Sequence, residues 1–175
     1  MASESALMRP AYVDQWERVQ RWYQRLYDLE NESTDTRDTN YHFDVAHSFF
    51  QDCYHLRDWL VCSGVVSKSD LDLMIYESVE LGICRNICNV MKHSSITRPG
   101  NNPDTHTFAY DTAEGGRWAI TREYIYPELR ERPNIEWVMT VMAGGKIYRC
   151  IDLASTCIKQ WQAFLLERNL VNQNT

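Results

Sequence analysis

The residues best suited to chemistry lie in one segment of this 175-residue sequence, residues 83–93. At about 100° per residue in a helix, its polar side chains share an arc of about 120°, and apolar side chains fill the rest. The arc consists of Arg85, Asn86, Asn89, Lys92 and His93. Arginine and lysine bind anions, and histidine, with an ordinary pKa of about 6.5, transfers protons near neutral pH. The segment therefore predicts an anion-binding site or a site for acid–base chemistry.

The charge around this arc differs from the charge of the whole chain. Residues 83–103 hold three basic residues, including Arg98, and no acidic residue, whereas the chain has a formal net charge of −6. Lys92 and Arg98 are therefore candidate phosphate-binding residues beside the arc. The overall acidity excludes a protein that coats nucleic acid through a basic surface. A solvated helix face and a buried polar network remain alternative interpretations.

A second polar strip lies on the preceding predicted helix, at residues 40–62. Its members recur every three or four positions and are Asp44, His47, Gln51, His55 and Asp58. If this strip faces the arc, Asp44 or Asp58 would hold Arg85 or fix the tautomer of His93. A partly exposed helix face is the alternative. Histidine and aspartate can also ligate metals, but the spacing matches no metal motif, so we expect neither a metal nor another cofactor.

The elements that position these residues follow from hydrophobic periodicity. A spacing of three or four between apolar residues predicts helices at 12–29, 40–62, 79–93 and 151–170, with a short helix capped by Ser67 or Ser69. Residues 94–106 predict a loop, since they combine proline, glycine and asparagine. Two stretches rich in β-branched and aromatic residues, 117–126 and 135–142, predict strands, and Gly144 with Gly145 predicts a hairpin.

These elements define a mainly helical α+β class. We expect one domain, residues 1–175, built as a bundle of about five helices. A small antiparallel sheet of about three strands is inserted at about 105–150, before the C-terminal helix. The hydrophobic fraction of 44% is ample for a core.

Composition also bears on the cellular compartment. No apolar run approaches the roughly 20 residues that cross a bilayer, and the N-terminus does not match a secretion signal. The six cysteines lie in apolar stretches without a Cys-x-x-Cys pair, which predicts free, buried thiols. We therefore expect a cytoplasmic protein that does not contact a membrane.

Arg85 and Asn86, followed by His93 on a late helix of a helical core, resemble the motif of the HEPN superfamily. These helical-bundle proteins include many prokaryotic toxin and phage-defence ribonucleases. Their motif is an arginine, often followed by a polar residue, and then a histidine after usually four to six residues. Asn86 matches the polar residue, but seven residues separate Arg85 from His93. The longer spacing leaves His93 about 80° from Arg85 around the helix.

The resemblance implies a metal-independent endoribonuclease in which the RNA 2′-hydroxyl attacks the adjacent phosphate. His93 would be the general acid or base, Arg85 would bind the phosphate, and Asn86 or Asn89 would orient it. Such sites form between two subunits, so the resemblance also implies a homodimer. A bacterial toxin or phage-defence protein is the first function hypothesis.

A non-catalytic interaction module is the alternative function. Residues 55–59, 88–93 and 158–161 are similar to a group of helical proteins from bacteria and phages that carry no known activity. The acidic charge and the long motif spacing favour a partner subunit or sensor of a bacterial defence or mobile-element system. The predicted strands carry Trp118, Tyr124, Tyr126 and Trp137, which could form a protein contact surface. The expected partners are thus a second copy, RNA or a nucleotide, or another protein.

Overall fold

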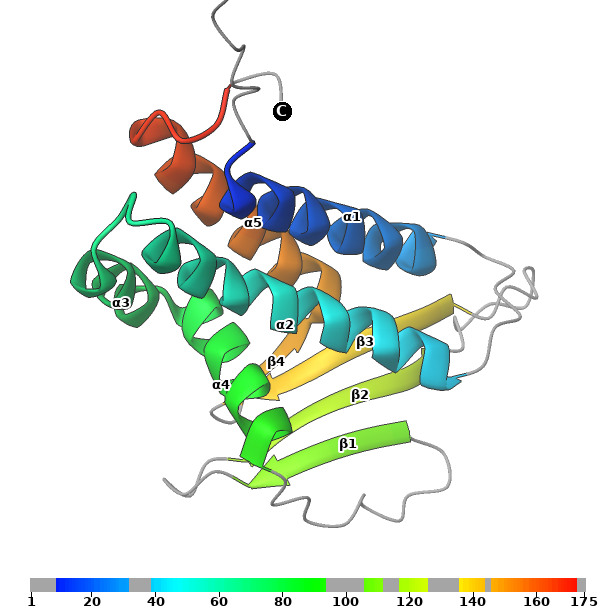
Figure 1. Ribbon diagram of the computed structural model, residues 1–175. Coiled ribbons are helices and arrows are strands. Elements are labelled where there is room, and N and C mark those ends of the chain that lie inside the picture. Colours follow the sequence, from blue (N-terminus) through cyan, green and yellow to red (C-terminus); the bar gives the residue numbers. More distant parts are fainter. Residues whose placement is uncertain are drawn as a thin grey trace, which may run out of the picture.

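A computed structural model describes residues 9–31, 39–93, 106–111, 117–125, 136–143 and 146–172; for 39, 89–93, 106–111, 117–125 and 136–138 it describes the backbone. These ranges contain five helices and a sheet before the last helix, which confirms the predicted fold class (Figure 1). In chain order the elements are α1 (Ala11–Asn31), α2 (Thr39–Cys62), α3 (Lys68–Glu77), α4 (Val79–His93), β1 (His106–Asp111), β2 (Arg117–Ile125), β3 (Glu136–Ala143), β4 (Lys146–Arg149) and α5 (Cys150–Glu167).

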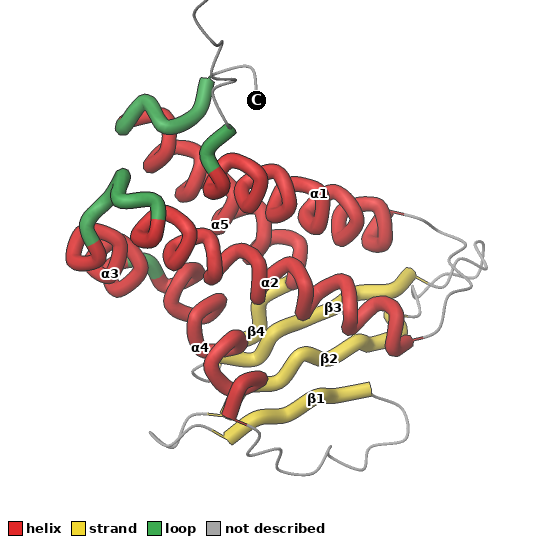
Figure 2. The backbone as a smooth tube through the Cα atoms, viewed as in Figure 1, coloured by secondary structure: helices red, strands yellow, loops and turns green. Residues whose placement is uncertain are grey.

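The helices form the main core because each one buries the apolar stripe that its sequence predicts. Trp16 of α1, Phe49 and Phe50 of α2 and Trp161 of α5 are fully buried within it. Side chains of this size bury large apolar areas and dominate the free energy of core formation. Figure 2 shows the helices gathered on one side of the sheet. None of the helices in the described ranges has the length and apolar character needed to span a membrane.

The sheet is an antiparallel meander with strand order β1-β2-β3-β4. The predicted hairpin is present, with Ala143 paired to Lys146. Met139, Val141 and Ala143 of β3 are buried while Met142 is exposed, as expected for a strand with one face on a core. The sheet has one strand more than the predicted three. The additional strand is β1, which pairs along its whole length with β2, the next strand in the chain, so its formation depends on both partners and not on its own six residues alone.

The sheet is tied to the bundle through Glu30 at the end of α1. Its carboxylate accepts hydrogen bonds from the Met139 backbone N–H (3.1 Å) and from Nη2 of Arg149 (2.9 Å). Burial raises the pKa of Glu30, and the two hydrogen bonds oppose that shift. The contact therefore fixes α1 against β3, although burial of the charged Glu30 carboxylate costs free energy.

Helix α3 is short and packs on one side only. Ser67 is its N-cap, with Oγ accepting from the backbone N–H of Asp70 at 3.1 Å. Leu71 and Ile75 face the core, whereas Leu73 and Tyr76 are 56% and 80% exposed. A helix held by one narrow stripe leaves open surface on both of its flanks.

Candidate functional site

Arg85 lies in a groove of about 590 Å³ between α2, α3 and α4. We call it the Arg85 groove. It is lined by Tyr54, Ser69, Asp72, Leu73, Ile75, Tyr76 and Arg85. The arginine itself is half-buried and belongs to the polar arc that the sequence predicts on this helix. The groove has the size of a small-molecule site and brings together a cation, hydroxyl groups, aromatic rings and the carboxylate of Asp72, which is bound by Arg57.

Arg85 differs from Arg57, the other arginine in this corner of the fold. Arg57 donates to Asp58 Oδ1 at 2.7 Å and, through Nε, to Asp72 Oδ1 at 2.6 Å. The Arg85 Nε instead donates to the amide Oδ1 of Asn86 at 3.3 Å. Within the described ranges, no carboxylate lies at ion-pair distance from Arg85. Because a guanidinium carries several N–H donors, most of those on Arg85 remain open to a ligand.

Two tyrosines add to this chemistry. Tyr54 on α2 is half-buried, and burial raises the pKa of its hydroxyl, with the positive charges of Arg57 and Arg85 acting in the opposite direction. The hydroxyl is therefore a neutral hydrogen-bond donor at physiological pH. Tyr76 on α3 exposes 80% of its surface and offers an open ring face to the same groove. Together these groups suit a ligand that joins an anion to a planar ring.

The remaining residues of the predicted arc follow Arg85 along α4. Asn86 is half-buried and contacts Arg85 directly. Asn89, Lys92 and His93 belong to the last turns of α4, where the backbone is described and the side chains are not. Eight helical positions put His93 about 12 Å beyond Arg85 along the helix axis. Arg98 falls outside the described residues.

The predicted supporting strip on α2 meets α4 through a histidine. Nε2 of His55 lies 3.6 Å from Sγ of Cys88, one turn after Arg85 on α4. His47, nearer the start of α2, is stacked on Phe43, and burial lowers its pKa against the opposing effect of Asp44. The strip thus contributes His55, its fourth member, to the interface with α4.

The predicted ion pair between this strip and Arg85 is not formed. Asp58 is bound by Arg57, its neighbour in the chain. Asp44 is exposed and lies about 20 Å from Asp58 along the axis of α2. Arg57 competes for Asp58, a partnership that the helical spacing did not predict. Tyr54 and Tyr76 were likewise not predicted as site residues. The sequence holds one indication of Tyr76: it lies beside the apolar stripe of α3, so its ring falls outside the core-facing side of that helix.

The cysteines give no sign of metal chemistry. All six are free, and five are buried as predicted, while Cys62 at the end of α2 is exposed. Sγ of Cys84 donates to the Phe50 carbonyl at 3.0 Å, and burial raises the pKa of the Cys84 and Cys150 thiols. Among the described residues, no group of three or more histidine, cysteine, aspartate or glutamate side chains is arranged to hold a metal ion.

Functional evidence comes from this chemistry rather than from relatives. Comparison with known proteins finds no family model, no curated protein and no solved structure that matches the chain.

Proposed function

We propose that the chain is a non-catalytic binding module that captures a phosphate-bearing nucleotide in the Arg85 groove. One observation carries the proposal: Arg85 lines the groove without a carboxylate at ion-pair distance in the described ranges, because Asp72 of the same groove is bound by Arg57. An arginine in this state binds phosphate with paired, charge-assisted hydrogen bonds. The location that fits this module is the cytoplasm, where nucleotides are abundant and six free cysteines stay reduced.

The other groups of the groove suit the rest of a nucleotide. The hydroxyl of Tyr54 provides a second donor near Arg85, and the exposed ring of Tyr76 provides a surface on which a base can stack. Leu73 extends the apolar side of the groove next to Tyr76. A free anion without a ring would use Arg85 and Tyr54 but not the ring of Tyr76, and would bind more weakly.

Binding is favoured over catalysis by the spacing along α4. A general acid or base must come within about 3 Å of the proton that it transfers, directly or through one water. His93 lies about 12 Å beyond Arg85 along the helix axis, about 1.5 Å more than the longest usual spacing of the motif, so the two residues are less suited to act on one phosphate within a subunit. A sensor or partner subunit in a bacterial defence or mobile-element system is the role that fits a binding module of this kind.

A metal-independent endoribonuclease is the second candidate function. The contact between Arg85 and Asn86 favours it, because the HEPN motif often places a polar residue directly after its arginine. In such an enzyme a homodimer would bring together the working groups of two subunits, and His93 would be supplied to a phosphate bound by Arg85 of the other subunit. RNA would then be substrate as well as ligand.

One set of assays separates the two functions. Wild-type protein is titrated with fluorescent ribonucleotides and with a labelled single-stranded RNA, both in excess chelator, and the RNA is then examined for cleavage. The variants are Arg85→Gln, which removes the charge, Arg85→Lys, which keeps it without the fork, and His93→Ala. Arg18→Gln is the matched control, since Arg18 is an exposed arginine on α1.

The module predicts nucleotide binding that weakens at least about tenfold in Arg85→Gln, less in Arg85→Lys and not in Arg18→Gln. It also predicts intact RNA throughout. Cleavage that disappears in both Arg85→Gln and His93→Ala would establish the ribonuclease instead. Nucleotide affinity unchanged in Arg85→Gln would contradict both functions.

A further inference from the structure

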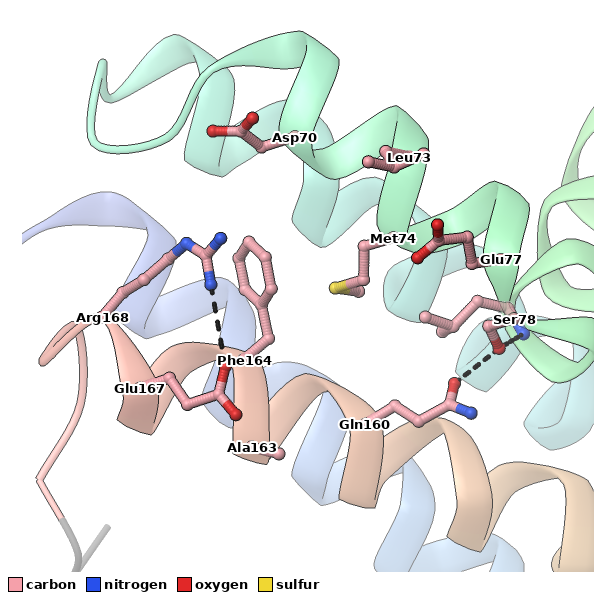
Figure 3. A pocket seen from close by; sticks show the side chains of 11 residues that line it. Asp70, Leu73, Met74, Glu77, Ser78, Gln160, Ala163, Phe164, Glu167 and Arg168 are labelled. Carbon is pink, nitrogen blue, oxygen red and sulfur yellow. Dashed lines mark hydrogen bonds and ion pairs between the residues drawn. The ribbon is translucent and has the colours of Figure 1, made fainter.

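A second groove, of about 510 Å³, runs along the other flank of α3, between α3 and α5 (Figure 3). Its apolar lining includes Met74 and Leu81 on one side and Ala163 and Phe164 of α5 on the other. We call it the acidic groove because three carboxylates, those of Asp70, Glu77 and Glu167, stand along it. An apolar floor between charged edges is the form of a surface that receives an amphipathic peptide.

Three of the four charged side chains that line this groove are negative. Arg168 is its only basic residue within the described ranges, and its Nη1 lies 4.0 Å from Glu167 Oε2 while its guanidinium covers the ring of Phe164 at 3.8 Å. Neither Asp70 nor Glu77 has a cation at ion-pair distance in the described part of the chain. The uncompensated charge repels nucleic acid and attracts a cationic partner.

Hydrogen bonds between α5 and the start of α4 hold one end of the groove. Ser78 Oγ donates to Gln160 Oε1 at 2.6 Å, and Gln160 Nε2 donates to Glu80 Oε2 at 3.3 Å. The three side chains join the start of α4 to α5, as Figure 3 shows for Ser78 and Gln160. Phe164 is fixed edge-on against Trp161, with ring centroids 6.0 Å apart. A surface held in this way loses little conformational freedom when a partner docks.

We infer that the acidic groove docks a cationic, amphipathic segment of a protein partner. Apolar side chains of the segment fill the space between Met74 and Phe164, and its lysines or arginines face Glu77 and Asp70. This surface lies on the other flank of α3 and shares only Leu73 with the Arg85 groove, so the inference stands whether or not Arg85 binds a nucleotide.

The test uses a synthetic amphipathic peptide of leucine and lysine, labelled for fluorescence anisotropy, and its counterpart with glutamate in place of lysine. Two variants address the groove: Glu77→Lys reverses a charge at its edge, and Ala163→Trp fills it without changing charge. Asp28→Lys is the matched control, since Asp28 is exposed on α1 and makes the same charge change far from the groove. Sedimentation of the protein alone is measured in parallel.

The expected result is binding of the lysine peptide but not of the glutamate peptide. The affinity for the lysine peptide falls about tenfold in Glu77→Lys and in Ala163→Trp and stays unchanged in Asp28→Lys. Equal affinity in all variants, or no binding to wild type, would overturn the inference. A wild-type dimer that Ala163→Trp converts to monomers would overturn it too, because the occupant would then be a second copy of the chain.

Discussion

The two flanks of α3 carry opposite chemistry. On one flank, Arg85 is a cation with no carboxylate at ion-pair distance in the described ranges; on the other, Asp70 and Glu77 are carboxylates with no cation at that distance in the same ranges. Leu73 lines both grooves, so one exposed side chain separates them. One short helix thus separates two grooves whose charged side chains without an ion-pair partner in the described ranges have opposite sign.

The largest effect is expected from Leu71→Ala, which should detach α3 and so open both grooves. Leu71 is fully buried and, with Ile75, anchors α3 to the core. Truncation leaves a cavity and costs about 2–5 kcal/mol of unfolding free energy, measured by urea denaturation. Both grooves should lose their ligands together.

Leu73→Ala is the matched control on the same helix. Because this leucine is 56% exposed, the unfolding free energy should change by less than about 0.5 kcal/mol. Equal destabilisation by the two changes would show that α3 is not anchored through Leu71.

Arg85→Gln removes the cation from one flank of α3 and leaves the carboxylates of the other flank in place. Loss of charge-assisted hydrogen bonds to phosphate should cost about 2 kcal/mol of nucleotide binding, while binding of a lysine-rich peptide to the acidic groove stays unchanged. Glu77→Lys should do the reverse. Isothermal titration of both ligands with both variants measures these affinities. A variant that weakens both ligands equally would contradict the assignment of one ligand to each groove.

Ser67→Ala gives a smaller effect on both flanks. The hydroxyl accepts the Asp70 N–H at the start of α3, and its removal should cost about 1 kcal/mol of unfolding free energy. Amide hydrogen exchange should rise in α3 and stay constant in α2. An exchange rate in α3 equal to that of wild type would argue against this cap.

The smallest effect concerns Glu30, which is remote from both grooves. Burial raises its folded pKa above the ordinary 4.5, so the folded state binds more protons and unfolding free energy falls as pH rises through this range. Glu30→Gln keeps an acceptor for Met139 and should remove this part of the pH dependence. Denaturation at a series of pH values measures it, with ligand binding in both grooves unaffected; identical pH profiles for variant and wild type would contradict the buried carboxylate.

Much of the helical fold could be predicted because its signals are local. The spacing of apolar residues predicts residues 79–93 as a helix, and α4 spans Val79–His93. Strand β1 could not be predicted from its six residues, because its hydrogen bonds depend on β2.

The site could be predicted in part for the same reason. The polar arc around Arg85 follows from helical geometry within one segment. Its surroundings depend on which helices meet, so the sequence did not show that Asp72 of α3 and Asp58 would both bind Arg57. That choice of partner leaves Arg85 without a carboxylate and turns a predicted ion pair into a candidate binding site.

The central claim is that Arg85, unlike Arg57, is open to a phosphate. NMR of the arginine side-chain Nε–Hε groups tests it most directly, with both signals assigned by Arg→Lys substitution and followed during titration with a ribonucleotide. We predict a saturable shift of the Arg85 signal and a nearly constant Arg57 signal, because Asp58 and Asp72 already occupy its donors. An unmoved Arg85 signal at saturating nucleotide, or equal shifts of both arginines, would contradict the account.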